Sequence, residues 1–388
     1  MLIERQAAPR VLEMLRYFPV VALTGARQVG KTTLLRCAQR DWKYFNLESP
    51  DTRTLIESDP VGFLESHPDQ IILDEIQRVP NLLSHLQVVV DEDRRPGKFL
   101  ISGSQNLLLS ESISQTLAGR AAYVALPGVS QTELRGAGLQ GEDVNETLFA
   151  GSYPGRISDA IPPHIFFDQY IATYLERDLR TLRNVTDLTQ FRRFMALLAG
   201  RIGSTLDYAS IANDIGTAPN TLRRWLSVLE ASYLVYELPP YYNNFGKRYI
   251  KSPKLYFTDT GLVCRLLGLT SAAQLEGHFA RGGLFENYVI MEVAKQIQNL
   301  GLDTKLYFYR DSNQVEVDLL IERAGTITPV EIKSSATFTN SFLKGLAKWA
   351  TLTNQPKTCG KLVHSGRPGP IGQVELVNVL DLTPVQSQ

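Results

Sequence analysis

The sequence predicts an α/β protein in which a parallel sheet flanked by helices is followed by helical segments and a second α/β unit. Three observations support this prediction. An apolar run at 20–23 leads through a glycine-containing loop into a helix-like run at 33–38. Further apolar runs at 70–73 and 98–101 end in polar residues, which is typical of buried parallel strands. The length of 388 residues exceeds one ordinary hydrophobic core, so two or three domains are expected.

The composition is that of a globular protein and excludes few functions. The 40 basic and 40 acidic residues cancel, so the overall charge does not favour nucleic acid or a membrane surface as a partner. No run of about 18 apolar residues is present, so no membrane span is expected. The three cysteines fit no disulfide or metal-ligand spacing, and no signal peptide is visible at the start. Together these features predict a cytoplasmic protein.

The loop after the first apolar run fits the pattern G-x-x-x-x-G-K-[ST], in the strand–loop–helix context that a phosphate-binding loop requires. Its glycines allow backbone angles and close approaches that a Cβ atom would block, and the N–H groups of the following helix would face a triphosphate. Lys31 would place a charge on the β- and γ-phosphates, and Thr32 would offer a hydroxyl ligand to Mg²⁺. The residues expected to bind the nucleotide here are Gly25, Ala26, Arg27, Gln28, Val29, Gly30, Lys31, Thr32 and Thr33.

Two acids follow the apolar run at 70–73. Asp74 would hold Mg²⁺ through water, and Glu75 would act on the attacking water as a general base or by orienting it. The strand predicted at 98–101 ends near Ser102, Ser104 and Gln105, and one of these would lie between the acids and the γ-phosphate to position that water. The alternative is that they are ordinary turn residues at a strand end.

Arg120 precedes another predicted strand, at 122–126. It could reach a γ-phosphate as an arginine finger, either in its own chain or in a neighbouring one. The alternative is a salt bridge that anchors the strand. Lys31, Glu75 and Arg120 are therefore the predicted catalytic residues.

At this point the sequence resembles a family of ATP-binding proteins of the AAA-type P-loop class that carry a C-terminal domain of unknown function. The resemblance implies an AAA-type ATPase core with ATP and Mg²⁺ as cofactors. It also implies homo-oligomerisation, which no other feature of the sequence indicates. The segments that carry it are 24–33, 72–75, 101–105, 117–120, 151–154, 174–179, 254–262 and 330–334.

The chain divides into four predicted parts. They are an AAA-type core at 1–140, a helical lid or connector at 141–190, a winged helix-turn-helix at 191–262, and a nuclease-like domain at 263–388.

The segment 191–262 shows three helix patterns and two short strands. Arg223 and Arg224 on the third helix, together with basic residues between the strands, could contact the phosphate backbone of DNA. A plain packing role is the alternative, because such modules also occur without nucleic-acid contact. The basic residues in and beside the second strand are Lys247, Arg248, Lys251 and Lys254.

The last part has the order α-β-β-β-α-β, and its acids resemble the PD-(D/E)xK nuclease core. Strand alternation places Glu331 and Lys333 on one face, where Asp318 on the adjacent strand could share a metal with Glu331. Glu286 would complete the acidic group around a second divalent metal, Mg²⁺ or Mn²⁺, while Lys333 would activate water or stabilise charge. Val317 stands where the family has proline. Whether such a domain cuts DNA or only binds stays open.

The sequence therefore predicts a Mg²⁺-dependent ATPase that couples its nucleotide state to the C-terminal region and acts on DNA. Two alternatives remain: a metal-dependent DNA nuclease gated by ATP, and a non-catalytic nucleotide switch that binds a protein partner.

Overall fold

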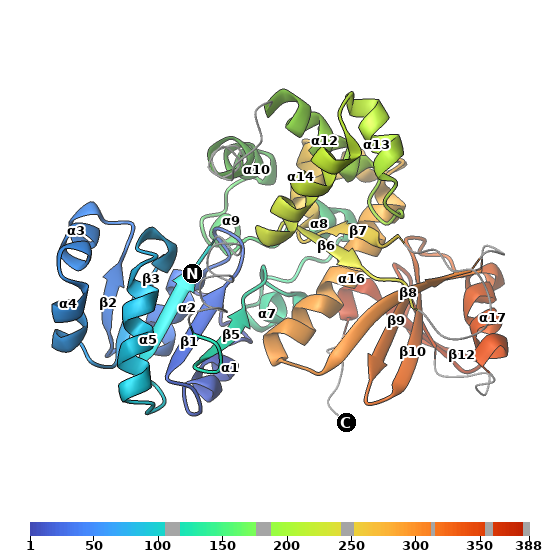
Figure 1. Ribbon diagram of the computed structural model, residues 1–388. Coiled ribbons are helices and arrows are strands. Elements are labelled where there is room, and N and C mark those ends of the chain that lie inside the picture. Colours follow the sequence, from blue (N-terminus) through green and yellow to red (C-terminus); the bar gives the residue numbers. More distant parts are fainter. Residues whose placement is uncertain (105–116, 176–187, 242–251, 312–314, 354–359, 383–388) are drawn as a thin grey trace.

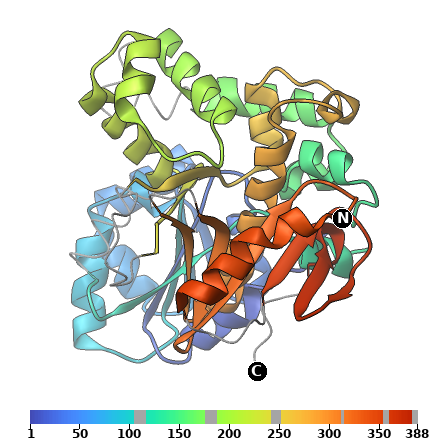
Figure 2. The same cartoon turned by 90° about the vertical axis from the view of Figure 1, so that its right-hand side faces the viewer.

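The computed structural model describes residues 1–104, 117–175, 188–241, 252–311, 315–353 and 360–382 (Figure 1). The chain forms an N-terminal parallel sheet, a helical module and a C-terminal mixed sheet, with the long helix α16 (Arg281–Leu300) beside the C-terminal sheet. In Figure 2 the C-terminal sheet lies in front of the N-terminal one, and the helical module lies above both. Within the described residues, no helix is both long and apolar enough to cross a membrane.

The N-terminal sheet confirms the predicted parallel architecture. Its strand order is β2-β3-β4-β1-β5, and every neighbouring pair is parallel. All residues of β1, β3 and β4 are buried, which explains their uninterrupted apolar runs. The strand β1 lies between β4 and β5. Because all strands run in the same direction, the loop after β1 lies at the carboxyl edge of the sheet, where ligands bind in such folds. The strands are β1 (Val20–Thr24), β2 (Lys43–Asn46), β3 (Ile71–Asp74), β4 (Phe99–Gly103) and β5 (Ala121–Ala125).

Helices flank this sheet and connect it to the next part of the chain. The helices α3 and α4 begin at a proline behind a capping residue, Ser49 for α3 and Asp59 for α4. The helices are α1 (Ala8–Met14), α2 (Lys31–Ala38), α3 (Pro50–Ser58), α4 (Pro60–Ser66), α5 (Leu82–Glu92) and α7 (Gln131–Gly136), with a short helix η1 (Ile76–Arg78).

The helical module contains the three helices and two strands predicted for 191–262. Gly216 ends α13 in the left-handed conformation (φ 79°), and Pro219 begins α14. The strands β6 and β7 pair antiparallel. The elements from the connector onward are α8 (Val144–Ala150), α9 (Pro154–Ser158), α10 (Pro163–Tyr170), η2 (Ile171–Leu175), α12 (Leu188–Gly200), α13 (Tyr208–Ile215), α14 (Pro219–Ala231), β6 (Val235–Leu238), β7 (Lys254–Phe257) and α15 (Thr260–Leu266). The last of these spans the predicted boundary at 262.

The C-terminal sheet has the order β12-β13-β11-β10-β9-β8. The strands β8, β9 and β10 pair antiparallel, whereas β10, β11 and β13 pair parallel. The predicted order α-β-β-β-α-β is present, but β12 and β13 were not predicted. The elements are η3 (Ala272–Leu275), α16, β8 (Thr304–Arg310), β9 (Glu316–Arg323), β10 (Thr326–Lys333), η4 (Asn340–Leu343), α17 (Lys344–Thr353), β11 (Lys361–His364), β12 (Gly369–Ile371), β13 (Val374–Asn378) and η5 (Val379–Asp381).

The parts share one continuous core rather than meeting through a thin linker. A single cluster of buried apolar side chains runs from Ala7 to Leu382. Polar contacts reinforce it, because Arg10 donates to the carbonyl of Gln298 on α16 (2.7 Å). Lys295 of the same helix donates to the carbonyl of Val129 (3.1 Å). The three parts are therefore packed against one another through apolar side chains as well as hydrogen bonds.

Candidate active site

The loop between β1 and α2 has the backbone that its glycines were predicted to supply. Gly30 has φ 93° and is the residue before the first turn of α2. Gly25 has φ 153°, and a Cβ atom there would lie 2.3 Å from the carbonyl oxygen of Leu126. A Cβ atom would therefore clash at Gly25, and the backbone angle disfavours any residue with a Cβ atom at Gly30. The loop opens at the carboxyl edge of the sheet, with the start of α2 directed at its centre.

Lys31 lies inside this loop. Its Nζ donates to the carbonyls of Gly25 and Ala26, both at 2.9 Å, and the residue is 5% exposed. Burial lowers the pKa of Lys31 to about 8, against the opposing charges of Glu75 and Asp74. The ammonium is thus held at the centre of the loop by two neutral carbonyl oxygens. Charged phosphate oxygens are stronger acceptors and can take their place. Thr33 and Gln28 are exposed beside it.

Asp74 and Thr32, the predicted magnesium residues, are in direct contact. The Thr32 hydroxyl donates to Asp74 Oδ2 at 2.6 Å. The same oxygen accepts from the Tyr44 hydroxyl at 2.7 Å, and Asp74 Oδ1 accepts from Ser102. A hydroxyl and a carboxylate at the mouth of a phosphate loop are oxygen ligands of the kind that Mg²⁺ prefers, so the residues fit this metal.

Glu75 has an unusual backbone that separates its side chain from that of Asp74. It adopts φ 60°, in the left-handed region that costs a residue with a Cβ atom free energy. The Ser102 hydroxyl accepts from the Glu75 N–H (3.1 Å), and Ser104 donates to Glu75 Oε2 (2.8 Å). Gln77 Nε2 donates to the same oxygen. The carboxylate is therefore fixed at the sheet edge, as a water-orienting group requires. Gln105 lies outside the described residues.

Three contributors to this site had not been recognised in the sequence. Tyr44 and Gln77 hold Asp74 and Glu75. Arg5 donates to the carbonyl of Val29 in the loop (2.6 Å) and to that of Pro127 (2.6 Å), and its Nε pairs with Glu133 at 3.1 Å. The position of Tyr44 on a strand ending beside the acids was a usable signal. No pattern near Arg5 in the sequence indicated that it supports the loop, because its partners lie far along the chain.

The structure places Arg120 away from the phosphate loop. It precedes β5, whose first residue, Ala121, pairs with Val20 at the start of β1. The loop follows the end of β1, so roughly 13 Å of strand separates the two. Arg120 instead donates to Asp91 through Nε (2.6 Å) and a terminal nitrogen (2.8 Å). The predicted contact with the γ-phosphate of its own chain is therefore wrong, and the alternative of an anchoring salt bridge describes its position.

The C-terminal acids come together, but two lysines accompany them. Lys333 Nζ lies 2.9 Å from both Asp318 Oδ2 and Glu331 Oε2. Glu286 pairs instead with Lys254, at 2.9 Å. In the part of the chain that the structure describes, no group of three or more His, Cys, Asp or Glu side chains is placed to hold a metal ion. The predicted second divalent metal therefore finds no support here.

The predicted basic cluster of the helical module is only partly visible. Lys247, Arg248 and Lys251 lie outside the described residues. Lys254 is 2% exposed and faces the interior, so its predicted contact with DNA is wrong. Arg223 and Arg224 are exposed on α14.

Known protein families account for most of the chain. A model described as AAA domain matches residues 17–135. Models described as domain of unknown function (DUF8612) and domain of unknown function (DUF4143) match residues 141–273 and 281–382. The proteins Mb2031c of Mycobacterium bovis and Rv2008c of Mycobacterium tuberculosis, both named uncharacterized, are 36% identical over 341 residues, which are 87% of this chain and 75% of each of them.

The chain belongs to the family of these two mycobacterial proteins, and its residues 17–135 match an AAA domain. The matched segment contains β1 to β5 and the loop, acids and hydroxyls described above, so it is an AAA domain of the ATP-binding P-loop class. The match at 281–382 carries no function in its description, and the nuclease resemblance there stays a prediction.

Solved structures overlap with the chain in part. The Walker-type ATPase PABY2304 of Pyrococcus abyssi aligns with a TM-score of 0.47 and 14% identity, over 68% of this chain and 96% of that one. AMPPCP-bound DnaA from Aquifex aeolicus aligns with a TM-score of 0.31 and 14% identity, over 58% of this chain and 86% of that one. The family assignment rests on the sequence matches.

Proposed function

We propose that this protein is a Mg²⁺-dependent ATPase that hydrolyses ATP to ADP and phosphate and transmits its nucleotide state to the C-terminal region. One observation carries the proposal. Lys31, Thr32 and Asp74 converge at the carboxyl edge of the sheet, with Glu75 held beside them by a separate set of hydrogen bonds. The AAA-domain match over 17–135 supports the same conclusion.

Each residue has a distinct part in this reaction. The loop N–H groups and the Lys31 ammonium bind the phosphates and offset their charge. Thr32 and Asp74 would hold Mg²⁺, which neutralises charge on the phosphates when it is bound. Glu75, fixed by Ser104 and Gln77, orients the attacking water and accepts its proton.

Phosphate release from ATP tests the proposal. Lys31→Ala should abolish turnover, because the loop loses the buried ammonium that lies at its centre and would bind the phosphates. Lys43→Ala is the matched control, since Lys43 is exposed on β2 and its removal should leave turnover unchanged. Unchanged turnover in Lys31→Ala would refute this site. Tight ATP binding by the wild type with negligible turnover would favour the non-catalytic switch instead.

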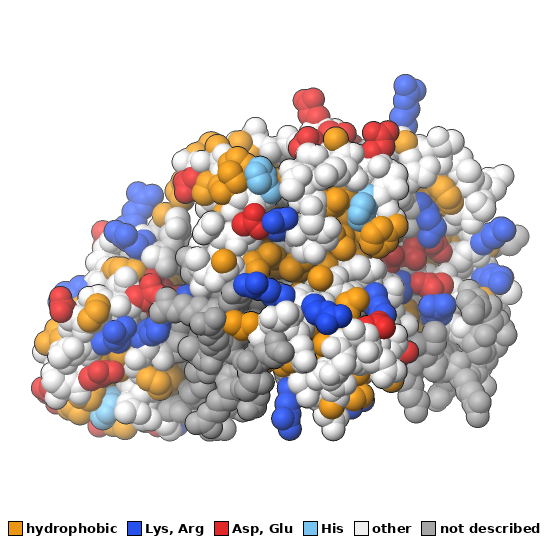
Figure 3. All heavy atoms as spheres, turned by 90° about the horizontal axis from the view of Figure 1, so that it is seen from above, with side chains coloured by type: hydrophobic (Ala, Val, Ile, Leu, Met, Phe, Trp, Pro, Cys, Tyr) orange, Lys and Arg blue, Asp and Glu red, His pale blue; other side chains and the backbone are white. Residues whose placement is uncertain are grey.

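A second candidate function, contact with nucleic acid, is supported by Arg223 and Arg224. Both are exposed on α14, the third helix of a helix-turn-helix order followed by a two-stranded sheet. Figure 3, which looks down on this module, shows acidic and basic side chains interspersed on the face in view. The test is DNA retention at low salt. Replacing both arginines by alanine should weaken it about uniformly across sequences, whereas Arg16→Ala, at an exposed site on the N-terminal part, should not.

A further inference from the structure

Four carboxylates gather where the helical module meets the C-terminal sheet. We call them the carboxyl cluster: Glu286 on α16, Glu316 and Asp318 on β9, and Glu331 on β10. They come from three elements, and a nuclease-type site would hold a divalent metal at this place. The cations that the structure places among them are instead side chains of the protein.

Lys254 is the cation that comes from another part of the chain. It is the first residue of β7, and its side chain is 3% exposed. Its Nζ lies 2.9 Å from Glu286 Oε1 and 2.6 Å from Glu316 Oε1. Two carboxylates at ion-pair distance, with the charge of Asp318 also acting on it, offset the cost of burying this ammonium.

The other carboxylates of the cluster also have partners within the protein. Lys333 pairs with Asp318 and Glu331, and Tyr256 donates to Glu286 Oε1 at 2.6 Å. The wall is tight, because a Cβ atom on Gly345 would lie 1.8 Å from Glu331 Oε1. A buried carboxylate deprived of its cation is strongly destabilising, so each acid needs the partner that it has.

We propose that Lys254 is a tethered cation that takes the place of a divalent metal among Glu286, Glu316 and Asp318, and so keeps the carboxyl cluster closed to metal ions. The donor set contains carboxylates suited to Mg²⁺ or Mn²⁺, but a metal can enter only when Lys254 leaves. This inference goes beyond ATP hydrolysis and does not depend on it. It also explains why the predicted second metal does not fit the chain in this conformation.

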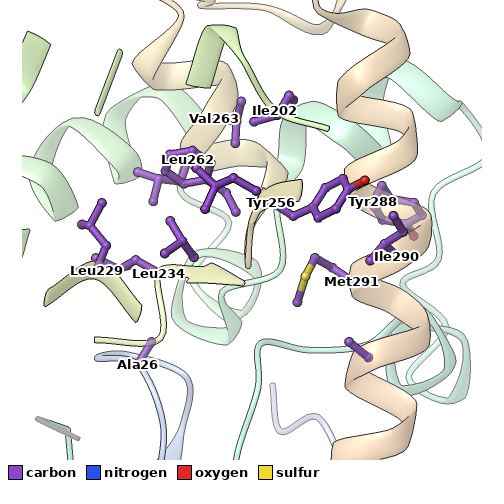
Figure 4. Close-up of a cluster of buried hydrophobic side chains, with 14 of the residues drawn as sticks. Ala26, Ile202, Leu229, Leu234, Tyr256, Leu262, Val263, Tyr288, Ile290 and Met291 are labelled. Carbon is purple, nitrogen blue, oxygen red and sulfur yellow. The ribbon is translucent and has the colours of Figure 1, made fainter. Parts of the chain in front are cut away.

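The two-stranded sheet β6–β7 carries Lys254, and the residues just before β6 reach the strand that leads into the phosphate loop. At the end of the sheet opposite Lys254, the Thr258 hydroxyl donates to the carbonyl of Tyr233 (2.7 Å). The Tyr233 hydroxyl lies 2.7 Å from Thr24 Oγ1, one residue before the loop. Figure 4 shows Leu234 in the same buried cluster as Ala26 of the loop. The segment that contains β6 and β7 therefore connects the strand before the phosphate loop with the carboxyl cluster, and its displacement would be the step that withdraws Lys254.

The proposal is tested by measuring Mn²⁺ binding to the full chain without nucleotide. Bound Mn²⁺ is measured as the loss of the free Mn²⁺ signal in electron paramagnetic resonance. The wild type should show no Mn²⁺ binding that depends on Asp318. Lys254→Met, which keeps the length of the side chain and removes its charge, should bind one additional Mn²⁺ at least tenfold more tightly than the wild type. Lys254→Met combined with Asp318→Asn should lose that ion, and Lys254→Arg should resemble the wild type.

Two results would overturn the proposal. One is Asp318-dependent Mn²⁺ binding by the wild type, and the other is a folded Lys254→Met chain that binds no more Mn²⁺ than the wild type. If that variant does not fold, acetylation of lysine side chains in the wild type tests the proposal instead. Mass spectrometry identifies which lysines have been acetylated. Lys254 should then resist acetylation equally with and without millimolar Mn²⁺, whereas labelling that rises with Mn²⁺ would show that the metal displaces it.

Discussion

The Tyr233 hydroxyl lies 2.7 Å from the Thr24 hydroxyl, and this hydrogen bond joins the helical module to the strand that carries the phosphate loop. Tyr233 adopts φ 57°, a left-handed conformation that is rare for an aromatic residue. The structure thus holds a strained residue at the point where the two parts meet. Such strain is kept only where the surrounding packing enforces it.

Tyr233→Phe should weaken ATP binding about fivefold, because a net hydrogen bond contributes about 1 kcal/mol to the alignment of Thr24 and the loop. Tyr236→Phe is the matched control, since Tyr236 lies on β6 and its ring packs against the core without reaching the loop. Equilibrium titration with a fluorescent ATP analogue measures both. Equal affinities in the two variants would remove the coupling role of Tyr233.

ATP affinity should depend on pH through Lys31. Burial lowers the pKa of this ammonium to about 8, so Lys31 of the free protein loses its charge as the pH rises above that value. Binding of the phosphates then requires uptake of a proton, and affinity should fall by up to about tenfold per pH unit above pH 8 while staying level below it. Lys31→Arg keeps its charge across this range, so its weaker binding should not change with pH. A slope that persists in the arginine variant would assign the effect to another group.

Glu75→Gln should separate binding from chemistry. The amide can still accept from Ser104, but it is a poor base, so turnover should fall by about a hundredfold or more while ATP affinity changes little. Phosphate release and nucleotide titration on the same preparation measure the two effects. Glu48→Gln offers the same change at an exposed position near the site and should behave like the wild type. Turnover near the wild-type rate in Glu75→Gln would exclude this carboxylate as the water-orienting group.

Gly25→Ala should abolish nucleotide binding and lower the free energy of unfolding by about 1–3 kcal/mol. The added Cβ atom would lie 2.3 Å from the carbonyl oxygen of Leu126, and the backbone at φ 153° disfavours any residue with a Cβ atom. Gly136→Ala is the control, because nothing lies within 4 Å of a Cβ atom at that position. Urea unfolding and nucleotide titration give both quantities, and normal ATP binding by Gly25→Ala would contradict the close approach seen here.

Local chemistry explains why much of the fold and site could be predicted. Uninterrupted apolar runs predicted β1, β3 and β4, which are buried on both faces of a parallel sheet. The contact between Thr32 and Asp74 followed from the same logic, since the carboxyl ends of parallel strands meet at one edge. Two-residue alternation likewise brought Glu331 and Lys333 to one face of β10.

The sequence by itself determined the phosphate loop and the strands that end in Asp74 and Ser102, because each depends on the pattern within one short segment. Only the tertiary structure decided the partners of Arg5, Arg120 and Lys254. These are long side chains whose charge is satisfied by whichever acceptor the packing brings near, and those acceptors lie in distant segments. Lys254 shows the difference most clearly: its sequence neighbours suggested a basic surface, but the meeting of β7 with α16 and β9 buried it among carboxylates.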